Sequence, residues 1–459
     1  MASDLDVLVL GSGQAGVPLA ARLAAAGRRV ALVERGALGG TCVNAGCTPT
    51  KTLLASARAA HVARTAGRLG IRAGEVAVDL GAVMDRKDAV VARWREGVRR
   101  RLDAAAPRLR VVPGAARFVG PREVEVAGER LAAPVVIVNV GARPAVPPVP
   151  GLDRVPFLTS SSALALRALP AHLVVLGGGY VGCELGQLFR RLGAGVTVID
   201  PSPHLLARED EAVSAALEEV FRREGLRLAL GAPAEAVEGG AGAVRVRLAG
   251  GGVVEGSHLL VATGRRPNTD DLGCDAAGVA LDRRGFVEVD ARYRTSAEGV
   301  YAVGDVAGGP QFTHSAWDDH RILFDLLLGG GRRTRDDRLV PHVVFTDPQV
   351  GVVGLTEREA RARGVPFELA TLPYSAVARA VEVDEPDGVV RVLVDPRDER
   401  ILGAAVVGAE GGELVHVVAA LMQAGASARA LVDMEMAHPT FCEGLQSAVM
   451  TLERFALRP

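Results

Sequence analysis

The sequence has few cysteines, few aromatic residues and no long apolar run. Five cysteines among 459 residues are too few for a disulfide-stabilised scaffold. No apolar run reaches the roughly 18 residues that a membrane-spanning helix needs. A net charge of -1 gives no bulk attraction to nucleic acid or to a membrane surface. Because a strand-like run begins within a few residues of Met1, we expect no signal peptide and a cytoplasmic protein.

Lysine is almost absent as well. Only Lys51 and Lys87 are lysines, and arginine supplies the rest of the 53 basic residues. A lysine that stands four residues after Cys47 indicates a role for a compact ammonium group at that place. The alternative is that a lysine stands at this position by chance.

The sequence does contain a repeated unit of strand, glycine-rich turn and helix. In the first copy, an apolar run at residues 5–10 leads into the turn and helix, and a second apolar run at 30–33 ends at Glu34. In the second copy the runs are 173–176 and 196–199, and the latter ends at Asp200. The copies are offset by 166 residues, and their turn glycines are Gly11, Gly13 and Gly16, then Gly177, Gly179 and Gly182.

Each copy has the pattern of a dinucleotide-binding site. The first glycine permits a tight turn, the second lets the backbone approach a pyrophosphate, and the third lets helix and strand pack closely. Backbone N–H groups at the helix N-terminus then hold the phosphates. We expect Glu34 and Asp200 to accept hydrogen bonds from adenosine ribose hydroxyls. Glycine-rich turns without a ligand are the alternative.

Asp200 also bears on the choice of nicotinamide cofactor. Its carboxylate would repel a 2′-phosphate, and residues 201–203 supply no arginine to receive one. His204 and Arg208 lie close by in sequence and could serve that purpose. We expect NADH to be favoured over NADPH.

The rest of the chain divides at proline- and glycine-rich stretches. Residues 144–151 are predicted to form a stiff connector into the second copy. After Thr263 the chain is expected to return to the first domain. From about Leu339 there follows a region with strands near 389–394 and 402–408 and helices around 412–424 and 444–456. This region has no nucleotide motif, and we expect a separate α+β domain.

A close pair of cysteines follows the first copy. Residues 39–49 read Gly-Gly-Thr-Cys-Val-Asn-Ala-Gly-Cys-Thr-Pro, and a long helical pattern comes next. Pro49 fits the first turn of that helix. Cys47 would then lie at the positive end of the helix dipole, which favours a thiolate. The pattern predicts a redox-active disulfide between Cys42 and Cys47; a zinc half-site and two packed thiols are the alternatives.

These residues resemble the class I pyridine nucleotide–disulfide oxidoreductases over essentially the whole chain. Besides the glycine motifs and the cysteine run, the resemblance rests on four further segments. They are 177–184 (Gly-Gly-Gly-Tyr-Val-Gly-Cys-Glu), 262–268 (Ala-Thr-Gly-Arg-Arg-Pro-Asn), 301–305 (Tyr-Ala-Val-Gly-Asp) and 438–443 (His-Pro-Thr-Phe-Cys-Glu).

The resemblance implies an α/β fold with two Rossmann-like dinucleotide-binding domains and a C-terminal α+β dimerisation domain. The expected domains are an FAD-binding domain at 1–145, an NAD(P)-binding domain at 146–270, a central segment at 271–338 that completes the FAD site, and the dimerisation domain at 339–459. The implied cofactors are FAD and NAD(H).

The family also implies roles for individual residues. Electrons would pass from NAD(P)H through FAD to the Cys42–Cys47 disulfide, with Cys47 as the thiolate against the flavin and Cys42 exchanging with substrate. Lys51 would pair with Glu184 near the flavin, and Tyr180 would shield the flavin until the nicotinamide displaces it. The expected cofactor residues besides the turn glycines and Tyr180 are Glu34, Gly40, Thr41 and Asp305 for FAD, and Asp200 and Gly264 for NAD. No metal site is predicted.

His438 is the expected acid/base. Thiol–disulfide exchange needs a proton acceptor, and an imidazole suits neutral pH. A carboxylate five residues later, at Glu443, can fix its tautomer. A lone histidine is more often structural, but the family pattern around His438 implies catalysis. The resemblance further implies that His438 acts on the partner subunit's cysteines, so that active sites are shared in a homodimer.

Three further segments bear on the acceptor of the electrons. Residues 344–350 (Val-Phe-Thr-Asp-Pro-Gln-Val), 139–144 and 310–315 resemble mercuric reductases and flavoproteins related to the copper reductase of reactive-chlorine resistance. The chain lacks the C-terminal cysteine pair of mercuric reductases. We expect a small disulfide, a soft metal ion or another oxidant as acceptor. The alternatives are a dihydrolipoamide dehydrogenase and a low-turnover flavin redox sensor. Cys442 is expected either to be buried at the dimer seam or to supplement the disulfide relay.

Overall fold

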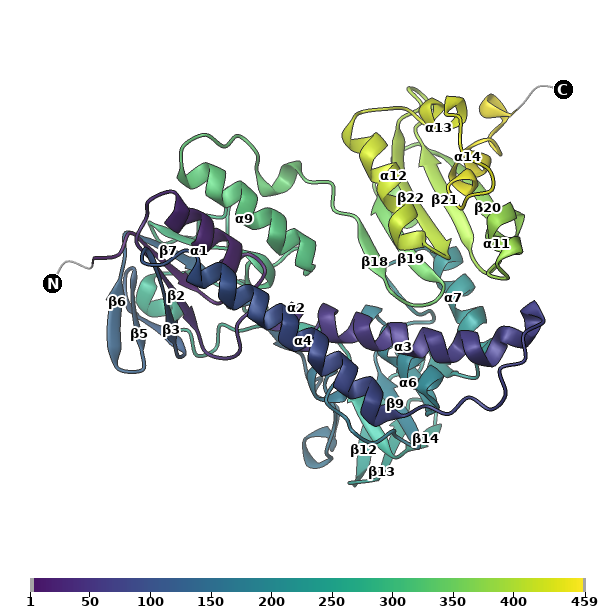
Figure 1. Ribbon diagram of the computed structural model, residues 1–459, viewed down its shortest axis with the longest axis horizontal. Coiled ribbons are helices and arrows are strands. Elements are labelled where there is room, and N and C mark those ends of the chain that lie inside the picture. Colours follow the sequence, from purple (N-terminus) through teal and green to yellow (C-terminus); the bar gives the residue numbers. More distant parts are fainter. Residues whose placement is uncertain (1–3, 457–459) are drawn as a thin grey trace. The chain divides into compact units, whose positions relative to one another are not determined.

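The computed structural model of the protein describes residues 4–456 (Figure 1). Its contacts divide the chain into two compact units. Unit 1 takes the chain up to Thr52, then Met84–Ala145 and Gly264–Arg338; unit 2 takes Leu53–Val83, Val146–Thr263 and the chain from Leu339 onward. The chain therefore returns to unit 1 after Thr263, and residues 53–83 group with unit 2. The expected boundaries of the FAD-binding, NAD(P)-binding and dimerisation domains stay predictions.

Unit 1 is built on a five-stranded parallel sheet in the order β17-β7-β1-β2-β3. Alternate residues of β1 (Val7–Leu10) face opposite sides, and all four are at most 4% exposed. Val7 and Val9 pack toward the helices α1 and α9, whereas Leu8 and Leu10 pack toward the three-stranded sheet β4-β5-β6. A strand buried on both faces requires a continuous apolar run, and residues 7–10 supply one.

The remaining elements of unit 1 are the other four strands of this sheet and the helices and strands that accompany it. They are α1 (Gly16–Ala25), β2 (Val30–Glu34), α2 (Gly40–Ala45), the start of α3 (Cys47–Thr65), most of α4 (Leu80–Asp103), β3 (Leu109–Pro113), β4 (Ala116–Gly120), β5 (Glu123–Val126), β6 (Glu129–Ala132), β7 (Val135–Val138), β8 (Ala142–Pro144), β16 (Arg265–Pro267), α8 (Cys274–Ala277), β17 (Val300–Ala302) and α9 (Thr313–Leu327). β17, which lies in the expected central segment 271–338, is an edge strand of the five-stranded sheet. The completion of an FAD site by this segment stays a prediction.

Unit 2 contains a second parallel sheet in the order β11-β10-β9-β15. One face packs against the antiparallel strands β12-β13-β14 through a core that includes Val174, Ile199 and Val246. The elements are α5 (Ser160–Ala163), β9 (His172–Leu176), α6 (Tyr180–Leu192), β10 (Gly195–Asp200), α7 (Glu211–Arg223), β11 (Arg227–Leu230), β12 (Ala234–Gly240), β13 (Ala243–Leu248), β14 (Val253–Gly256) and β15 (His258–Val261).

The C-terminal part of unit 2 is a five-stranded antiparallel sheet in the order β18-β19-β22-β21-β20. Its elements are β18 (His342–Val344), β19 (Gln349–Gly354), α10 (Glu357–Ala362), β20 (Glu368–Pro373), α11 (Ala378–Glu382), β21 (Val389–Val394), β22 (Ile401–Gly408), α12 (Gly411–Gln423), α13 (Arg429–Asp433) and α14 (Glu443–Val449). The helix expected at 444–456 ends at Val449, and a short 3-10 turn follows at 453–455. The predicted α/β fold with a C-terminal α+β domain is confirmed. Within residues 4–456, no helix has both the length and the apolar character needed to cross a bilayer.

Candidate active site

The glycine turn of the first module is shaped by very close backbone contacts. Gly11 follows β1 with a φ of +107°, a conformation that side chains disfavour. A Cβ on Gly11 would lie 2.3 Å from the Asn139 carbonyl oxygen, and one on Gly16 would lie 2.0 Å from the Gly11 carbonyl oxygen. A Cβ on Gly40 would lie 2.7 Å from the Gly13 Cα. These positions leave no room for side chains, so the backbone itself forms the surface of the turn.

Asn139 is a site residue whose role the sequence did not predict. Its Oδ1 accepts a hydrogen bond from the Gly16 amide at 2.9 Å, and its Nδ2 donates to the Val303 carbonyl at 3.1 Å. Asn139 directly follows β7, which pairs in parallel with β1, and Val303 directly follows β17. The Asn139 side chain therefore ties the end of β7 to the start of α1 and to the end of β17.

Glu34 lies at the end of β2, at the same edge. Its carboxylate accepts hydrogen bonds from the Ser12 amide at 2.9 Å, the Ser12 hydroxyl at 2.6 Å and the Gly36 amide at 2.8 Å. These bonds hold an acceptor beside the glycine turn. A carboxylate at this place is suited to accept hydrogen bonds from a ribose.

A cavity of about 320 Å³ joins these groups, and its lining includes Gly11, Gly13, Glu34, Gly40, Thr41 and Asn139. Asp305 lies farther along unit 1, after β17, and Arg265 Nη2 lies 3.3 Å from its Oδ2. Burial raises the pKa of Asp305, although the charge of Arg265 opposes this shift. Backbone without side chains, a helix N-terminus and a strand-end carboxylate are the features that a dinucleotide needs, so these residues fit FAD.

The two cysteines lie on consecutive helices of unit 1. Cys42 is in α2 and Cys47 is the first residue of α3. Between them, a Cβ on Gly46 would lie 2.8 Å from the Thr41 carbonyl oxygen and 3.2 Å from the Cys42 Cα. The chain therefore folds back tightly at Gly46, which brings the two thiols together.

The surroundings of this pair favour a thiolate on Cys47. Cys47 is the first residue of a 19-residue helix, and Thr313 is the first residue of α9. The Cys47 sulfur lies 3.1 Å from the Thr313 hydroxyl. Helix N-termini stabilise negative charge. A hydrogen bond to Cys47, burial and the charge of Cys47 raise the pKa of Cys42 well above its usual range, against a smaller effect of Lys51. The helix N-terminus and the Thr313 hydroxyl thus favour negative charge on the Cys47 sulfur, while the Cys42 thiol is held protonated.

The second module repeats the first in unit 2. Gly177 has a φ of +109°, and its Cβ would lie 2.5 Å from the Ala262 carbonyl oxygen. A Cβ on Gly182 would lie 1.8 Å from the Gly177 carbonyl oxygen, whereas one on Gly179 would meet no atom within 4 Å. Gly264 lies in the connection before β16, and its carbonyl accepts a hydrogen bond from the Ala145 amide at 2.9 Å. The predicted role of Gly264 in NAD binding stays a prediction.

Asp200 ends β10 as Glu34 ends β2. Its Oδ2 accepts from the Gly178 amide at 2.6 Å and its Oδ1 accepts from the Ser202 amide at 2.8 Å. His204 lies 3.3 Å from Glu218 through Nδ1 and 3.7 Å from Glu211 through Nε2. The ring of His204 is therefore engaged by carboxylates.

Tyr180 begins α6 and belongs to a cluster that the sequence did not predict. Its hydroxyl donates to Glu209, and its ring stacks on His342 with centroids 5.6 Å apart. His342 Nε2 lies 3.0 Å from the same Glu209 oxygen. Burial favours the neutral form of Glu209, but the hydrogen bonds from His342 and Tyr180 outweigh it and lower its pKa. An ionised carboxylate therefore anchors the Tyr180 hydroxyl.

Lys51 and Glu184 lie in different units. Lys51 is one helical turn after Cys47 on α3, and its charge acts on Cys42. Glu184 is on α6, only 6% exposed, and its Oε1 accepts a hydrogen bond from the Phe345 amide at 2.9 Å. The pairing of Lys51 with Glu184 stays a prediction.

His438 and Glu443 form the expected pair at the start of α14. His438 Nδ1 lies 2.9 Å from Glu443 Oε1, and Glu443 Oε2 accepts from the Thr440 amide at 2.7 Å. The Thr440 amide and then His438 lower the pKa of Glu443. Nδ1 faces the carboxylate, and Nε2 is the ring nitrogen that Glu443 does not contact. The acid/base role of His438 stays a prediction. The His438 side chain is 69% exposed, so it projects away from its own domain.

Cys442 packs partly buried against the core of the C-terminal sheet, and burial raises its pKa. Within residues 4–456, no group of three or more His, Cys, Asp or Glu residues is arranged to hold a metal ion.

Comparison with known proteins agrees with these features. The family model described as pyridine nucleotide-disulphide oxidoreductase matches residues 5–319, and the model of the family's dimerisation domain matches residues 340–449. A dihydrolipoyl dehydrogenase of Thermus scotoductus is 38% identical, with 98% of each chain covered. A mercuric reductase of Staphylococcus aureus is 35% identical over 98% of this chain and 83% of its own.

Among solved structures, the chain resembles a Cu(II) complex of the HOCl-induced flavoprotein disulfide reductase RclA from Escherichia coli. The TM-score is 0.90 at 34% identity, and the match covers 98% of this chain and 99% of the other. The dimerisation domain supports a homodimer. The matched domains, together with the cysteine pair and the two nucleotide modules, show that the chain belongs to the pyridine nucleotide-disulfide oxidoreductases. It is an FAD-dependent enzyme of that family.

Proposed function

We propose that the enzyme uses NADH to reduce a small disulfide, a soft metal ion or another oxidant at the Cys42–Cys47 pair. The observation that carries this proposal is the placement of Cys47. It begins α3, contacts the first residue of α9, and has Cys42 beside it with a raised pKa. Such surroundings favour a reactive thiolate over a structural thiol.

The residues that would hold FAD are those of the first module. Gly11, Gly13 and Gly16 would face the diphosphate, Glu34 would accept from the adenosine ribose, and Asp305 would bind the ribityl chain. Gly40 and Thr41 line the same cavity. When bound, FAD supplies two-electron transfer between a reduced nicotinamide and a disulfide.

In the second module, Gly177, Gly179 and Gly182 would receive the nicotinamide cofactor. NADH would be favoured because the Asp200 carboxylate at the end of β10 would repel a 2′-phosphate. His204, which could otherwise receive that phosphate, is engaged by Glu218 and Glu211. Tyr180 would lie over the flavin and move aside for the nicotinamide, and Lys51 with Glu184 would form a charged pair beside it.

Exchange with a disulfide acceptor would use both thiols and the imidazole. The Cys42 thiol gives its proton to His438 Nε2 and attacks one substrate sulfur, and the departing thiolate takes that proton. The Cys47 thiolate then attacks Cys42, which re-forms the Cys42–Cys47 bond and releases the second product as a thiolate. Because His438 is exposed on the dimerisation domain, we propose that it serves the cysteines of the partner subunit, so that active sites are shared.

Variants of the cysteines test this proposal. In Cys42→Ser and Cys47→Ser, we expect NADH still to bleach the flavin under anaerobic conditions, while turnover with disulfide or metal acceptors falls at least about a thousandfold. Cys442→Ser is the matched control and should retain turnover. Full activity in both active-site variants would leave a plain flavin dehydrogenase and refute the proposal.

Dihydrolipoamide oxidation by NAD⁺ is the second candidate. The His438–Glu443 contact and the full-length similarity to the Thermus scotoductus enzyme favour it. Assays with lipoamide, mercuric ion and cupric ion, run side by side with NADH, separate the candidates. Cupric ion is included because the solved relative is a Cu(II) complex.

A further inference from the structure

The Phe345–Pro348 segment, which contains the Phe-Thr-Asp-Pro motif, lies against one face of α6. Glu184, Gln187 and Arg191 are three and four residues apart along α6, so their side chains share that face. All of these residues belong to unit 2. The segment follows β18 directly and leads into β19.

Each of the three side chains binds the segment. The Phe345 amide donates to Glu184 Oε1 at 2.9 Å. Two hydrogen bonds join Gln187 to the backbone of Asp347: the Asp347 amide donates to Oε1 at 2.8 Å, and Nε2 donates to the Asp347 carbonyl at 2.6 Å. Arg191 Nη1 donates to the Asp347 carboxylate at 2.5 Å.

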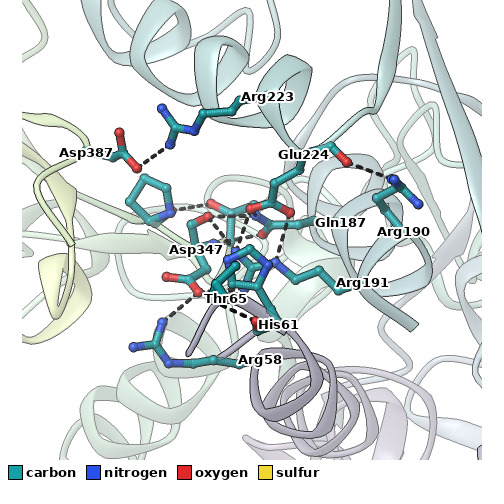
Figure 2. Close-up of polar contacts among 12 residues, drawn as sticks. Arg58, His61, Thr65, Gln187, Arg190, Arg191, Arg223, Glu224, Asp347 and Asp387 are labelled. Atoms are coloured by element: carbon teal, nitrogen blue, oxygen red, sulfur yellow. Dashed lines mark hydrogen bonds and ion pairs between the residues drawn. The ribbon is translucent and has the colours of Figure 1, made fainter. Parts of the chain in front are cut away.

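Further charges hold this network in place (Figure 2). Arg191 also donates to Glu224 at 2.9 Å and 2.6 Å, and Arg58 donates to Asp347 at 2.6 Å. Burial opposes ionisation of Asp347, but the charges of Arg191 and Arg58 outweigh it and lower its pKa. Gln187 is 1% exposed. Gln187 and Arg191 are buried members of this network, and buried polar groups whose hydrogen bonds are satisfied are held rigidly.

We infer that Gln187, Arg191 and Asp347 are positioning residues for the Glu184 carboxylate, acting through the Phe345 amide. They fix the backbone of the segment from one end, and the segment in turn presents one N–H to Glu184. A glutamate side chain has three rotatable bonds, so a fixed donor on one oxygen restricts where the carboxylate lies. The inference rests on the proposed role of Glu184 beside the flavin.

Gln187→Met keeps the length of the side chain and removes both hydrogen bonds to Asp347. In the FAD-loaded enzyme, we expect the rate of flavin reduction by NADH to fall about tenfold, because small displacements at a reacting centre have large kinetic effects. The NADH dissociation constant should change less than about twofold. A second readout, which does not depend on activity, is hydrogen exchange: the amides of residues 345–347 should exchange faster.

Arg190→Ala is the matched control on the same helix. Arg190 donates to the carbonyls of Glu224 and Ala194, at 2.7 Å and 3.4 Å, and so supports the same region without binding the segment. Its flavin reduction and its exchange at 345–347 should stay at the wild-type level. Equal effects of Arg190→Ala and Gln187→Met would indicate a merely structural role and overturn the inference.

A double-mutant cycle with Glu184→Gln separates this inference from the proposed function. If Gln187 acts through Glu184, Gln187→Met should slow flavin reduction no further in the Glu184→Gln background. Additive losses would overturn the inference while leaving the role of Glu184 intact. If Glu184→Gln alone reduced flavin at the wild-type rate, the proposed role of Glu184 would fail, and the inference with it. Should Gln187→Met not fold, Arg191→Lys replaces it in the same cycle, with the same expectations.

Discussion

The two nucleotide modules have nearly the same backbone turn and differ in what surrounds it. The φ values of Gly11 and Gly177 are +107° and +109°, and the strand-end carboxylates each accept a hydrogen bond from the amide after that glycine, at 2.9 Å and 2.6 Å. Each turn also touches the carbonyl oxygen of a residue that follows a neighbouring strand. That residue is Asn139 in the first module and Ala262 in the second.

The exchange of Asn139 for Ala262 changes how tightly the turn is bound to its surroundings. Asn139 ties the first turn to Val303, and its Oδ1 would lie 3.1 Å from a Cβ on Gly13. Ala262 has no such side chain, and Gly179 faces open space. Instead, the second module has a side-chain cluster at its helix start, in which Tyr180 is held by Glu209 and His342. A closed, cross-linked turn suits a resident cofactor, and an open turn beside an anchored aromatic ring suits one that exchanges.

The largest expected effect comes from a matched pair of glycine variants. In Gly16→Ala the new Cβ would lie 2.0 Å from a backbone oxygen, and in Gly182→Ala 1.8 Å. We expect Gly16→Ala to purify with little FAD, and Gly182→Ala to retain FAD but to be reduced by NADH at least about a hundredfold more slowly, since overpacking costs several kcal/mol. Flavin absorbance and anaerobic stopped-flow measurements check this.

Two glycines on ordinary helix positions are the controls for that pair. A Cβ on Gly97 in α4 would meet no atom within 4 Å, and a Cβ on Gly186 in α6 would have its nearest neighbour at 3.6 Å. Their alanine variants should keep both properties. Equal loss of FAD in Gly16→Ala and Gly182→Ala would show that the modules are not functionally separate.

Asn139→Ala probes the difference between the modules directly. The Gly16 amide and the Val303 carbonyl would both lose their partner, and each buried hydrogen bond contributes about 1 kcal/mol or more. We therefore expect FAD to bind about ten to a hundredfold more weakly, as measured by titration of the apoenzyme. Ala262→Ser alters the equivalent place in the second module and should leave FAD affinity unchanged; a similar loss there would remove the distinction.

The sequence predicted the two turns because they are local. The glycine spacing, the strand ends at Glu34 and Asp200, and the position of Cys47 at a helix start all follow from short runs of residues. The contacts that distinguish the modules are not local. Asn139 is 123 residues from Gly16, and His342 is 162 residues from Tyr180, so these contacts depend on strand order and on the packing of a later domain. The Phe-Thr-Asp-Pro motif was visible, but its binding to α6 required the structure.

Asp200→Asn sharpens the assignment of the second module. The change removes the negative charge and keeps the shape, so a 2′-phosphate meets less repulsion. One such charge pair near the surface is worth about 1–2 kcal/mol, and we expect the ratio of kcat/KM for NADPH over NADH to rise about tenfold. FAD content should not change.

Glu34→Gln is the companion variant in the first module. In this variant FAD should bind more weakly, while the preference between NADH and NADPH stays constant. A shift of that preference would contradict the assignment of the two carboxylates.

The smallest expected effect concerns the anchored ring of the second module and its dependence on pH. The pKa of Glu209 is lowered below its ordinary 4.5, so folding favours the ionised carboxylate. Its contribution to stability is complete above that ordinary value and is lost as the pH falls through the lowered one. We expect Glu209→Gln to lower the melting temperature by about one to two degrees at pH 7, which corresponds to about 1 kcal/mol, and the difference from wild type to shrink below about pH 4.5. Glu211→Gln is the control, because the Glu211 side chain is 82% exposed, and it should differ little from wild type at either pH.

A stability difference for Glu209→Gln that stayed constant with pH would contradict this account. It would mean that the Tyr180 ring is held by packing against His342 rather than by the Glu209 carboxylate. The two modules would then not differ in having a charged group that anchors the ring.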